Sequence, residues 1–291
     1  MAELIERLTI IRNNDKAETE ESQLTEIVEG GGDSGSEDSS SELITEKEEV
    51  DLSPSPRSSL EPGQVFYRLE KVSFKPPGWE KNLISELSLT IRENSNLLIM
   101  GQSGCGKSSL LRVLRGVWPH SGQLETAVQE EDILYLAQTP FLSSGSLLDL
   151  VTYPGLASDL SEAAKTSLMS LLSLCQLSPL VRRYEEVEQD NWYTALSPGE
   201  QQRIAWVRLL HHRPRLAVLD EATSALSEEL ESLMYSEAGR AGISLVSVGH
   251  RASLRQYHHH LLVIGQEGTW RTGLVRDYNS QSSLFLNNTS T

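Results

Sequence analysis

The sequence predicts an α/β domain built on a mostly parallel sheet. Short apolar runs typical of buried strands alternate with longer stretches of helical spacing, and this alternation favours a parallel arrangement. A glycine-rich turn also lies between one such strand and the helix that follows it. Both features begin near Val65, because the preceding residues are mostly acidic or small and polar.

The expected elements follow one another in chain order. The run at 97–100 has the length of a buried strand, whereas 87–91 alternates between polar and apolar residues. Residues 141–195 are leucine-rich with helical spacing, which predicts a helical insertion. We expect strands at 65–72, 87–91, 97–100, 216–219 and 243–248 and helices at 198–211 and 228–240.

The net charge of −16 is unevenly distributed. Residues 15–61 hold fifteen Asp/Glu and three Lys/Arg, a net of −12, which leaves −4 for the rest of the chain. We expect no nucleic-acid partner, because such proteins present a basic face. The segment 13–61 is also rich in Ser and Gly and buries too little apolar surface to offset chain entropy. It is therefore expected to be a disordered acidic linker.

Cysteine and histidine usage gives no metal pattern. Cys105 and Cys175 lack the spacing of metal ligands, which favours a reduced, cytosolic compartment. The run 258–260 consists of three histidines that could hold a metal, but we expect them in a solvated turn at a sheet edge. No apolar run approaches the roughly 20 residues of a membrane-spanning helix.

The glycine-rich turn fits the phosphate-binding pattern G-x-x-x-x-G-K-[ST]. Backbone N–H groups of such a loop and the following helix N-terminus hold phosphates. Lys107 would reach the β- and γ-phosphates, and Ser108 would ligate Mg²⁺. A chance glycine turn is the alternative, and the flanking strand and helix argue against it. We expect a P-loop NTPase core that binds ATP and Mg²⁺ through Gly101, Gln102, Ser103, Gly104, Cys105, Gly106, Lys107, Ser108 and Ser109.

Two carboxylates end the apolar run at 216–219. The carboxyl end of a strand in such a sheet faces the nucleotide. Asp220 would therefore hold Mg²⁺, and Glu221 would act as general base on the attacking water. A strand that ends in a solvated turn is the alternative, which the neighbouring phosphate loop disfavours.

A third motif narrows the class. Ser197 and Glu200 form a capping box with Pro198 at the first helical position, and alone this indicates only a well-capped helix. The segment 196–203, Leu-Ser-Pro-Gly-Glu-Gln-Gln-Arg, also resembles the signature motif of ABC ATPases. That motif closes over the γ-phosphate held by a second copy. The resemblance implies a head-to-tail homodimer in which Ser197, Gly199 and Glu200 contact nucleotide.

Further ABC motifs occur in the expected order. Gln138 resembles the Q-loop, which touches Mg²⁺ and the membrane domain, and His250 resembles the H-loop, which contacts the γ-phosphate. The segment 224–227 resembles the D-loop, with Ser227 in place of its aspartate. The implied catalytic set is Glu221, His250, Lys107 and Gln138, and Gln138 joins Ser108 and Asp220 as an implied metal ligand. Trp79 is available to stack on adenine, although the usual tyrosine is missing.

The resemblance covers roughly residues 65–264 and extends to subfamily D, the peroxisomal and lysosomal half-transporters. It rests on the segments 110–119, 191–200 and 247–251. With Pro198 in place of its first glycine, the signature motif resembles that of the subfamily's lysosomal cobalamin-exporting branch. Members that carry long-chain acyl-CoA into peroxisomes usually have two glycines in this motif. The implied location is the cytosolic face of the lysosomal membrane, or else of the peroxisomal one.

The same resemblance implies a domain organisation. Residues 1–12 would end the last membrane helix, and 62–280 would form the ATPase domain with an N-terminal antiparallel β subdomain and a helical subdomain at about 141–210. Residues 281–291 would be a flexible tail. The implied partners are a second copy of the domain and the membrane domain of the same transporter.

Two other classes of function remain open. A soluble ABC ATPase is one, but only 58 positions separate Gln138 from Leu196, too few for the coiled coil of DNA-repair members. Translation factors of the family carry two cassettes, and this chain has one. A nucleotide-switched binding module is the other. Glu221 and His250 argue against a nucleotide-switched binding module, and Pro198 favours one.

Overall fold

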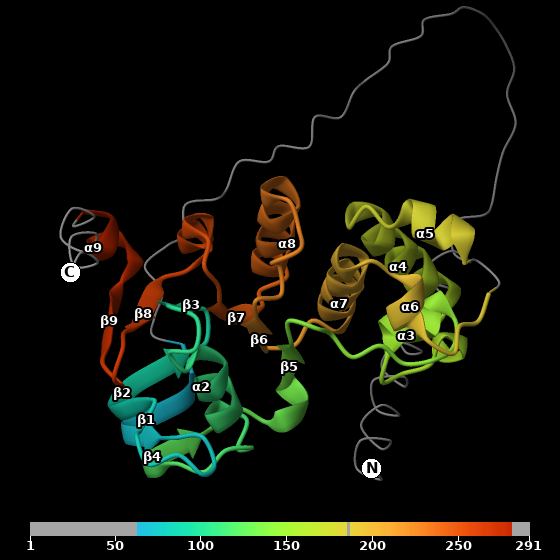
Figure 1. Cartoon of the computed structure of the whole chain (residues 1–291). Helices are drawn as coiled ribbons and strands as arrows, with labels where there is room; N and C mark the ends of the chain where they lie inside the picture. The colour runs from blue at the N-terminus through green and yellow to red at the C-terminus, as the bar shows by residue number, and fades with distance from the viewer. Residues whose placement is uncertain (1–62, 185–186, 281–291) are drawn as a thin grey trace, which may run out of the picture. The chain divides into compact units, whose positions relative to one another are not determined.

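Two β-sheets organise residues 63–184 and 187–280, the part of the chain that this computed structural model describes (Figure 1). The larger sheet has the order β5-β6-β7-β3-β8-β9, and all its strands except β9 run parallel. Its strands are β3 (Leu97–Gly101), β5 (Ile133–Leu136), β6 (Leu216–Asp220), β7 (Ser244–Val248), β8 (His260–Ile264) and β9 (Trp270–Leu274). The smaller sheet is antiparallel, with the order β2-β1-β4. It comprises β1 (Val65–Phe74), β2 (Ile84–Arg92) and β4 (Ser121–Thr126).

The helices are unevenly distributed between the strands, and five of the described α-helices fall between β5 and β6. The α-helices are α2 (Lys107–Leu114), α3 (Leu147–Thr152), α4 (Glu162–Leu174), α5 (Ser178–Arg183), α6 (Trp192–Ala195), α7 (Pro198–His212), α8 (Glu228–Arg240) and α9 (Val275–Ser280). Short 3-10 helices are η1 (Glu130–Asp132), η2 (Ala157–Asp159) and η3 (Ala252–Tyr257). The predicted fold class, α/β with a mostly parallel sheet, an antiparallel β part and an inserted helical part, is confirmed.

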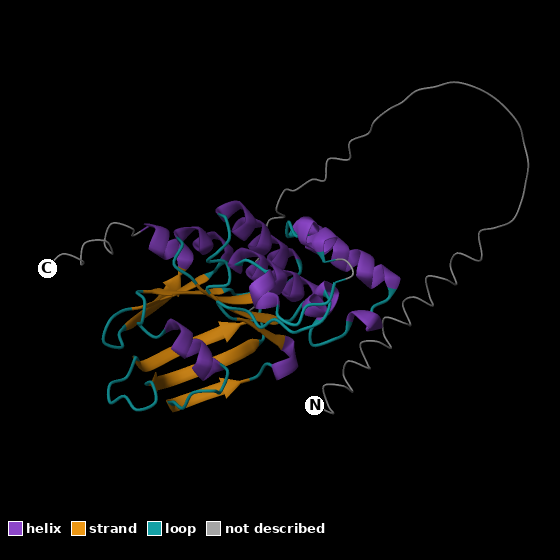
Figure 2. Ribbon diagram, turned by 45° about the vertical axis from the view of Figure 1, so that its right-hand side comes forward, coloured by secondary structure: helices purple, strands orange, loops and turns teal. Residues whose placement is uncertain are grey.

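The parallel sheet is buried on both faces, which explains why its strands are continuous apolar runs. Leu97 and Ile99 of β3 point to a core shared with α2 and the antiparallel sheet. Leu98 lies between them and points to the opposite core, which α7, α8 and the helical part complete. The strands thus lie in layers with α2 between the two sheets (Figure 2).

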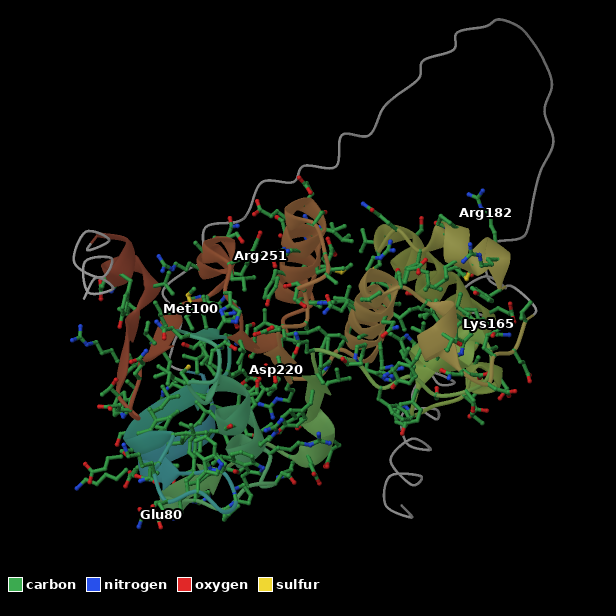
Figure 3. All side chains as sticks on the ribbon, in the orientation of Figure 1. Glu80, Met100, Lys165, Arg182, Asp220 and Arg251 are labelled. Carbon is green, nitrogen blue, oxygen red and sulfur yellow. The ribbon has the colours of Figure 1, made fainter. Side chains whose placement is uncertain are left out.

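The helical part packs on the rest of the domain chiefly through α7. Helices α3 and α4 both pack against α7, and Leu168 and Leu172 of α4 are fully buried in that core. Ser146 and Ser161 accept hydrogen bonds at the N-termini of α3 and α4, so each short helix has a side-chain cap. Figure 3 shows Lys165 and Arg182 in this part, well away from Asp220 on β6.

The structure differs from expectation at four strands and at the histidine run. The sequence did not predict β4, β5, β8 or β9, and β4 is short, polar and largely exposed. The expectation of a solvated turn at the histidines was wrong. His258 is buried, and His260 begins β8, which pairs with the inner strand β3. Within the described residues, no group of three or more His, Cys, Asp or Glu is placed to hold a metal.

Several expectations concern residues that the structure does not describe. The membrane-helix end at 1–12, the acidic linker at 13–61 and the tail at 281–291 all lie outside the described residues. Among the helices of residues 63–184 and 187–280, none has the length and apolar character required to cross a membrane.

Candidate nucleotide site

The carboxyl ends of the parallel strands meet at one edge of the larger sheet, and the predicted site residues outside the signature segment lie there. Gln138 follows β5, Asp220 ends β6 with Glu221 directly after it, and His250 follows β7. The phosphate loop follows β3, next to β7 in the sheet. Residues 112 positions apart in the chain are thereby brought into contact, as Ser108 and Asp220 are. The topology thus turns four separate motifs into a single cluster.

The phosphate loop is closely packed against the sheet at its first glycine. Gly101 has φ 156°, and a Cβ built there would lie 2.4 Å from the carbonyl oxygen of Ile264. Gly106 caps α2 in the left-handed region, with φ 109°. Only glycine fits both demands, so the loop has the backbone freedom that phosphate cradles need. The carbonyls of Gly101 and Gln102 accept hydrogen bonds from the Lys107 ammonium at 3.0 and 2.9 Å.

Ser108 and Asp220 provide the oxygen ligands that Mg²⁺ prefers. The Ser108 hydroxyl donates to Asp220 Oδ1 at 3.0 Å. Burial raises the pKa of the Asp220 carboxyl and the charge of Glu221 adds to the rise, while Ser108, Arg112 and Lys107 oppose it. A carboxylate whose charged form is disfavoured in this way gains from a nearby cation. The residues present therefore fit Mg²⁺ with a nucleotide phosphate.

Glu221 lies between two of the other predicted residues. Its Oε1 lies 2.8 Å from His250 Nε2, and its Oε2 accepts from Gln138 Nε2 at 3.2 Å. Glu221 has φ 51°, a left-handed conformation that a residue with a Cβ rarely adopts. The Glu221 N–H donates to the Val248 carbonyl at 3.1 Å, which anchors this backbone to the end of β7. Such strain is common where a side chain must point in one direction.

Gln202 was not predicted as a site residue, yet it connects several loops of this edge. This buried side chain of α7 places Nε2 within 3.3 Å of the carbonyls of Gln138 and Glu221. Its Nε2 also reaches the Ser224 hydroxyl at 3.0 Å, and its Oε1 accepts from the Ala225 N–H at 2.9 Å. The only signal in the sequence was the place of Gln202 within the signature segment 196–203.

The signature segment forms the N-terminus of α7. The Ser197 hydroxyl and N–H both donate to Glu200 Oε2, at 2.7 and 2.8 Å. Burial disfavours the charged form of the Glu200 carboxyl, but these hydrogen bonds together with the charges of Arg203 and Arg183 lower its pKa. A Cβ on Gly199 would lie 3.1 Å from the Ala225 carbonyl, so this turn packs closely on the segment before α8. Ser227 caps α8, which a serine does as well as an aspartate.

The predicted residues thus form two groups. The loop residues Gly101 to Ser109 adjoin Gln138, Asp220, Glu221 and His250 at the sheet edge. Ser197, Gly199 and Glu200 lie at the N-terminus of α7, and within the described residues no hydrogen bond joins them to the phosphate loop.

A cavity of about 280 Å³ opens beside the phosphate loop. Gln102 and Cys105 line one side of it, and Trp79 lies on another with 59% of its surface exposed. Gln266, which the sequence did not single out, donates to Gln102 Oε1 at 3.1 Å from the loop after β8. An exposed aromatic ring at such a cavity could stack on a nucleotide base.

Comparison with known proteins identifies the family of this chain. The family model described as ABC transporter matches residues 84–224. The lysosomal cobalamin transporter ABCD4 of Homo sapiens is 43% identical over 220 residues, which are 73% of this chain and 36% of that protein. ATP-binding cassette sub-family D member 1 of Drosophila melanogaster is 38% identical over 210 residues, 70% of this chain and 29% of that protein. The chain therefore spans about a third of the length of these relatives.

A solved structure shares the fold. A bacterial Atm1-family ABC exporter with ATP bound superposes with a TM-score of 0.65 at 21% identity, over 78% of this chain and 41% of that one. The phosphate loop, the paired carboxylates and the parallel sheet define a P-loop nucleoside triphosphatase domain. The chain belongs to the ABC transporter family, of which it carries the ATPase domain, and the two relatives described above are members of subfamily D.

Proposed function

We propose that this chain is the ATP-hydrolysing domain of a half-transporter that exports cobalamin from the lysosome to the cytosol. The observation that carries the ATPase mechanism is the pair of contacts from Glu221 to His250 and Gln138, beside the Ser108–Asp220 pair. In this mechanism Glu221 polarises the attacking water as general base. Lys107 and His250 stabilise charge on the γ-phosphate, and Mg²⁺ supplies further charge neutralisation when it is bound by Ser108, Asp220 and Gln138.

The adenine base would bind in the cavity beside the loop. Trp79 takes the part of the stacking ring, because it is the exposed aromatic residue that lines this cavity together with Gln102 and Cys105. Its exposure of 59% leaves a face free for a base.

Two copies of the domain would complete each site. Ser197 and Gly199 lie on α7, in a group separate from the phosphate loop, so a second copy would bring them to the γ-phosphate. A two-fold head-to-tail pair makes both sites identical. The helix N-terminus at Ser197 would then supply N–H groups to the phosphate.

A groove of about 690 Å³ is a suitable dock for the membrane domain. Ala137 and Thr139, the two neighbours of Gln138 in the chain, both line it, and so does Tyr193. Phe141 and Tyr153 present exposed rings 5.0 Å apart on this groove, and large exposed aromatic residues are typical of interface centres. A segment bound here would act on Gln138 through the same loop.

The proposed cargo rests on similarity. The lysosomal cobalamin transporter of Homo sapiens is 43% identical in this region, and Pro198 supports the same branch. The proposed location is accordingly the cytosolic face of the lysosomal membrane. Long-chain acyl-CoA, imported into peroxisomes, is the competing cargo, and the test must distinguish it from cobalamin.

Reconstitution of the complete protein into liposomes tests the proposal. With the ATPase domain facing outward, ATP should drive cobalamin out of the vesicle lumen, and Lys107→Ala should abolish both transport and ATP hydrolysis. Stimulation of the ATPase by oleoyl-CoA and not by cobalamin would transfer the assignment to the acyl-CoA carriers. A wild-type protein that binds ATP without hydrolysing it would contradict the ATPase mechanism.

A further inference from the structure

A carboxylate outside the nucleotide site is almost completely buried. Glu231 lies in the first turn of α8, and only 1% of its surface is exposed. Glutamates are almost never buried to this extent unless both carboxylate oxygens have partners, because the charged group loses its hydration. The contacts of Glu231 therefore indicate why the domain keeps it.

Three side chains from two loops satisfy this carboxylate. The Thr223 hydroxyl donates to Glu231 Oε2 at 2.7 Å, and the Ser253 hydroxyl donates to Oε1 at 3.0 Å. Arg251 Nη1 donates to Oε2 at 3.2 Å. Thr223 lies two residues after Glu221, and Arg251 directly follows His250. The segments that carry Glu221 and His250 are therefore both hydrogen-bonded to the Glu231 carboxylate on α8.

Arg251 extends the connection to the turn before α8. Its Nη2 donates to the Leu226 carbonyl at 2.8 Å, next to Ser227, the N-cap of α8. The guanidinium thus bridges a buried carboxylate and a backbone carbonyl, a task suited to its fixed fork of donors. Figure 3 shows Arg251 beside α8, with Asp220 at the end of β6.

We propose that Glu231 and Arg251 form a positioning pair that holds His250 in contact with Glu221. The same pair fixes the position of the turn at 224–227 relative to His250 and Glu221. Neither residue of the pair touches the Glu221 carboxylate, so the pair acts on hydrolysis only through His250 and the backbone. The contact that it maintains is the 2.8 Å distance between His250 Nε2 and Glu221 Oε1. This inference rests on the proposed ATPase function.

Loss of the Glu231–Arg251 pair should affect the rate of ATP hydrolysis more than the affinity for ATP. The phosphate loop and the Ser108–Asp220 pair have no hydrogen bond to Glu231 or Arg251 among the described residues. Loss of the pair should therefore leave ATP affinity nearly unchanged. A misplacement of His250 by about 1 Å is enough to lower the rate by about 10²-fold.

Steady-state ATPase assays of the complete protein test the pair. Glu231→Gln should lower kcat by about 10- to 100-fold and leave the KM for ATP within about threefold of wild type. The double variant Glu231→Gln/Arg251→Gln should be no slower than the slower single variant, because both changes remove one connection. Glu237→Gln is the matched control, since it breaks an exposed ion pair with Arg240 on the same helix.

Each outcome bears on the inference. A kcat for Glu231→Gln within about threefold of wild type would overturn it, as would an increase in KM that equals the loss in kcat/KM. If Glu231→Gln fails to fold, Arg251→Lys decides the matter, because it keeps the charge and loses the second hydrogen bond to Leu226. Arg251→Lys should then lower kcat with KM unchanged, and an unaltered kcat refutes the pair. A wild-type protein without ATPase activity would instead refute the proposed function.

Discussion

The Glu221 carboxylate and the His250 ring nitrogen Nε2 lie 2.8 Å apart at the ends of neighbouring strands. Strands β6 and β7 run parallel, with Asp220 opposite Val248 in the register. The chain therefore delivers Glu221 one residue beyond this pair and His250 two residues beyond it. The contact follows from the register of the sheet, and the left-handed backbone of Glu221 directs its side chain toward it.

We expect Glu221 and His250 to act on hydrolysis as a unit. Glu221→Gln removes the general base and should lower ATP turnover by about 10²–10⁴-fold while ATP still binds. His250→Ala should also slow turnover, and the double variant should be scarcely slower than Glu221→Gln alone, because residues that act together are strongly non-additive. Turnover rates of the complete protein and its three variants measure this. Rate losses that multiply in the double variant would show that the two side chains act independently.

A second expectation concerns assembly. Residues 1–291 expressed by themselves should be monomeric and nearly inactive, because each site needs Lys107 of one copy and Ser197 of another, and the proposed membrane domain would be needed to raise their effective concentration. Sedimentation of the Glu221→Gln variant with ATP and Mg²⁺ should reveal weak dimers.

Ser197→Arg should abolish the nucleotide-dependent dimer, because it places a bulky charge where the second copy would close. The same variant should still bind ATP, since Ser197 makes no contact with the phosphate loop of its own chain. A tight dimer in the absence of nucleotide would contradict the head-to-tail assembly.

The sequence predicted the site residues wherever a motif assigns a backbone position. Asp220 and Glu221 could be predicted because a four-residue apolar strand ends at them, and Ser108 because the glycine loop precedes it. Gln202 and Gln266 could not, because their roles depend on which loops approach them in space. Glu231 also escaped notice, since a glutamate near a helix N-terminus is usually a solvated cap residue.

The missed strands have physical reasons as well. Strand β5 has only four residues, and β4 is an almost wholly polar, largely exposed edge strand of the antiparallel sheet. Strand β8 begins within the histidine run, where composition indicated a turn. Its pairing with β3 on one side and β9 on the other outweighs that local preference.

A third expectation concerns acid stability through His258. This buried ring places Nδ1 2.7 Å from the Leu254 carbonyl, so Nδ1 carries the proton, and Nε2 accepts from the Ser247 hydroxyl at 2.8 Å. Burial lowers the pKa of His258 to about 4, the Leu254 carbonyl opposes this shift, and the charge of His259 adds to it. Between pH 4 and 6.5 the unfolded chain therefore binds more protons than the folded one.

Stability should accordingly rise with pH across that window and fall as pH drops from 6.5 to 4, by up to about 3 kcal/mol from this residue. His258→Gln keeps a donor and an acceptor but cannot titrate, so its free energy of unfolding should vary less over the same range. Urea unfolding at pH 4.5 and 7 measures the difference, with the exposed His120→Gln as control. A wild-type chain whose stability is equal at both pH values would refute this account.

The last expectation separates the two cysteines by reactivity. Cys175 is fully buried, its Sγ lies 3.7 Å from Met234 Sδ, and burial raises the pKa of its thiol to about 12. Cys105 is partly exposed and lines the cavity beside the phosphate loop. Because the thiolate is the reactive form, N-ethylmaleimide should label Cys105 first.

Bound Mg-ATP should protect Cys105, since the phosphates would cover the loop, and prior labelling should block ATP binding. Mass spectrometry of the labelled peptides with and without ATP decides this, with Cys105→Ser as control. Faster labelling of Cys175 would contradict the expected order of reactivity. Equal labelling of Cys105 in both conditions would place the nucleotide elsewhere.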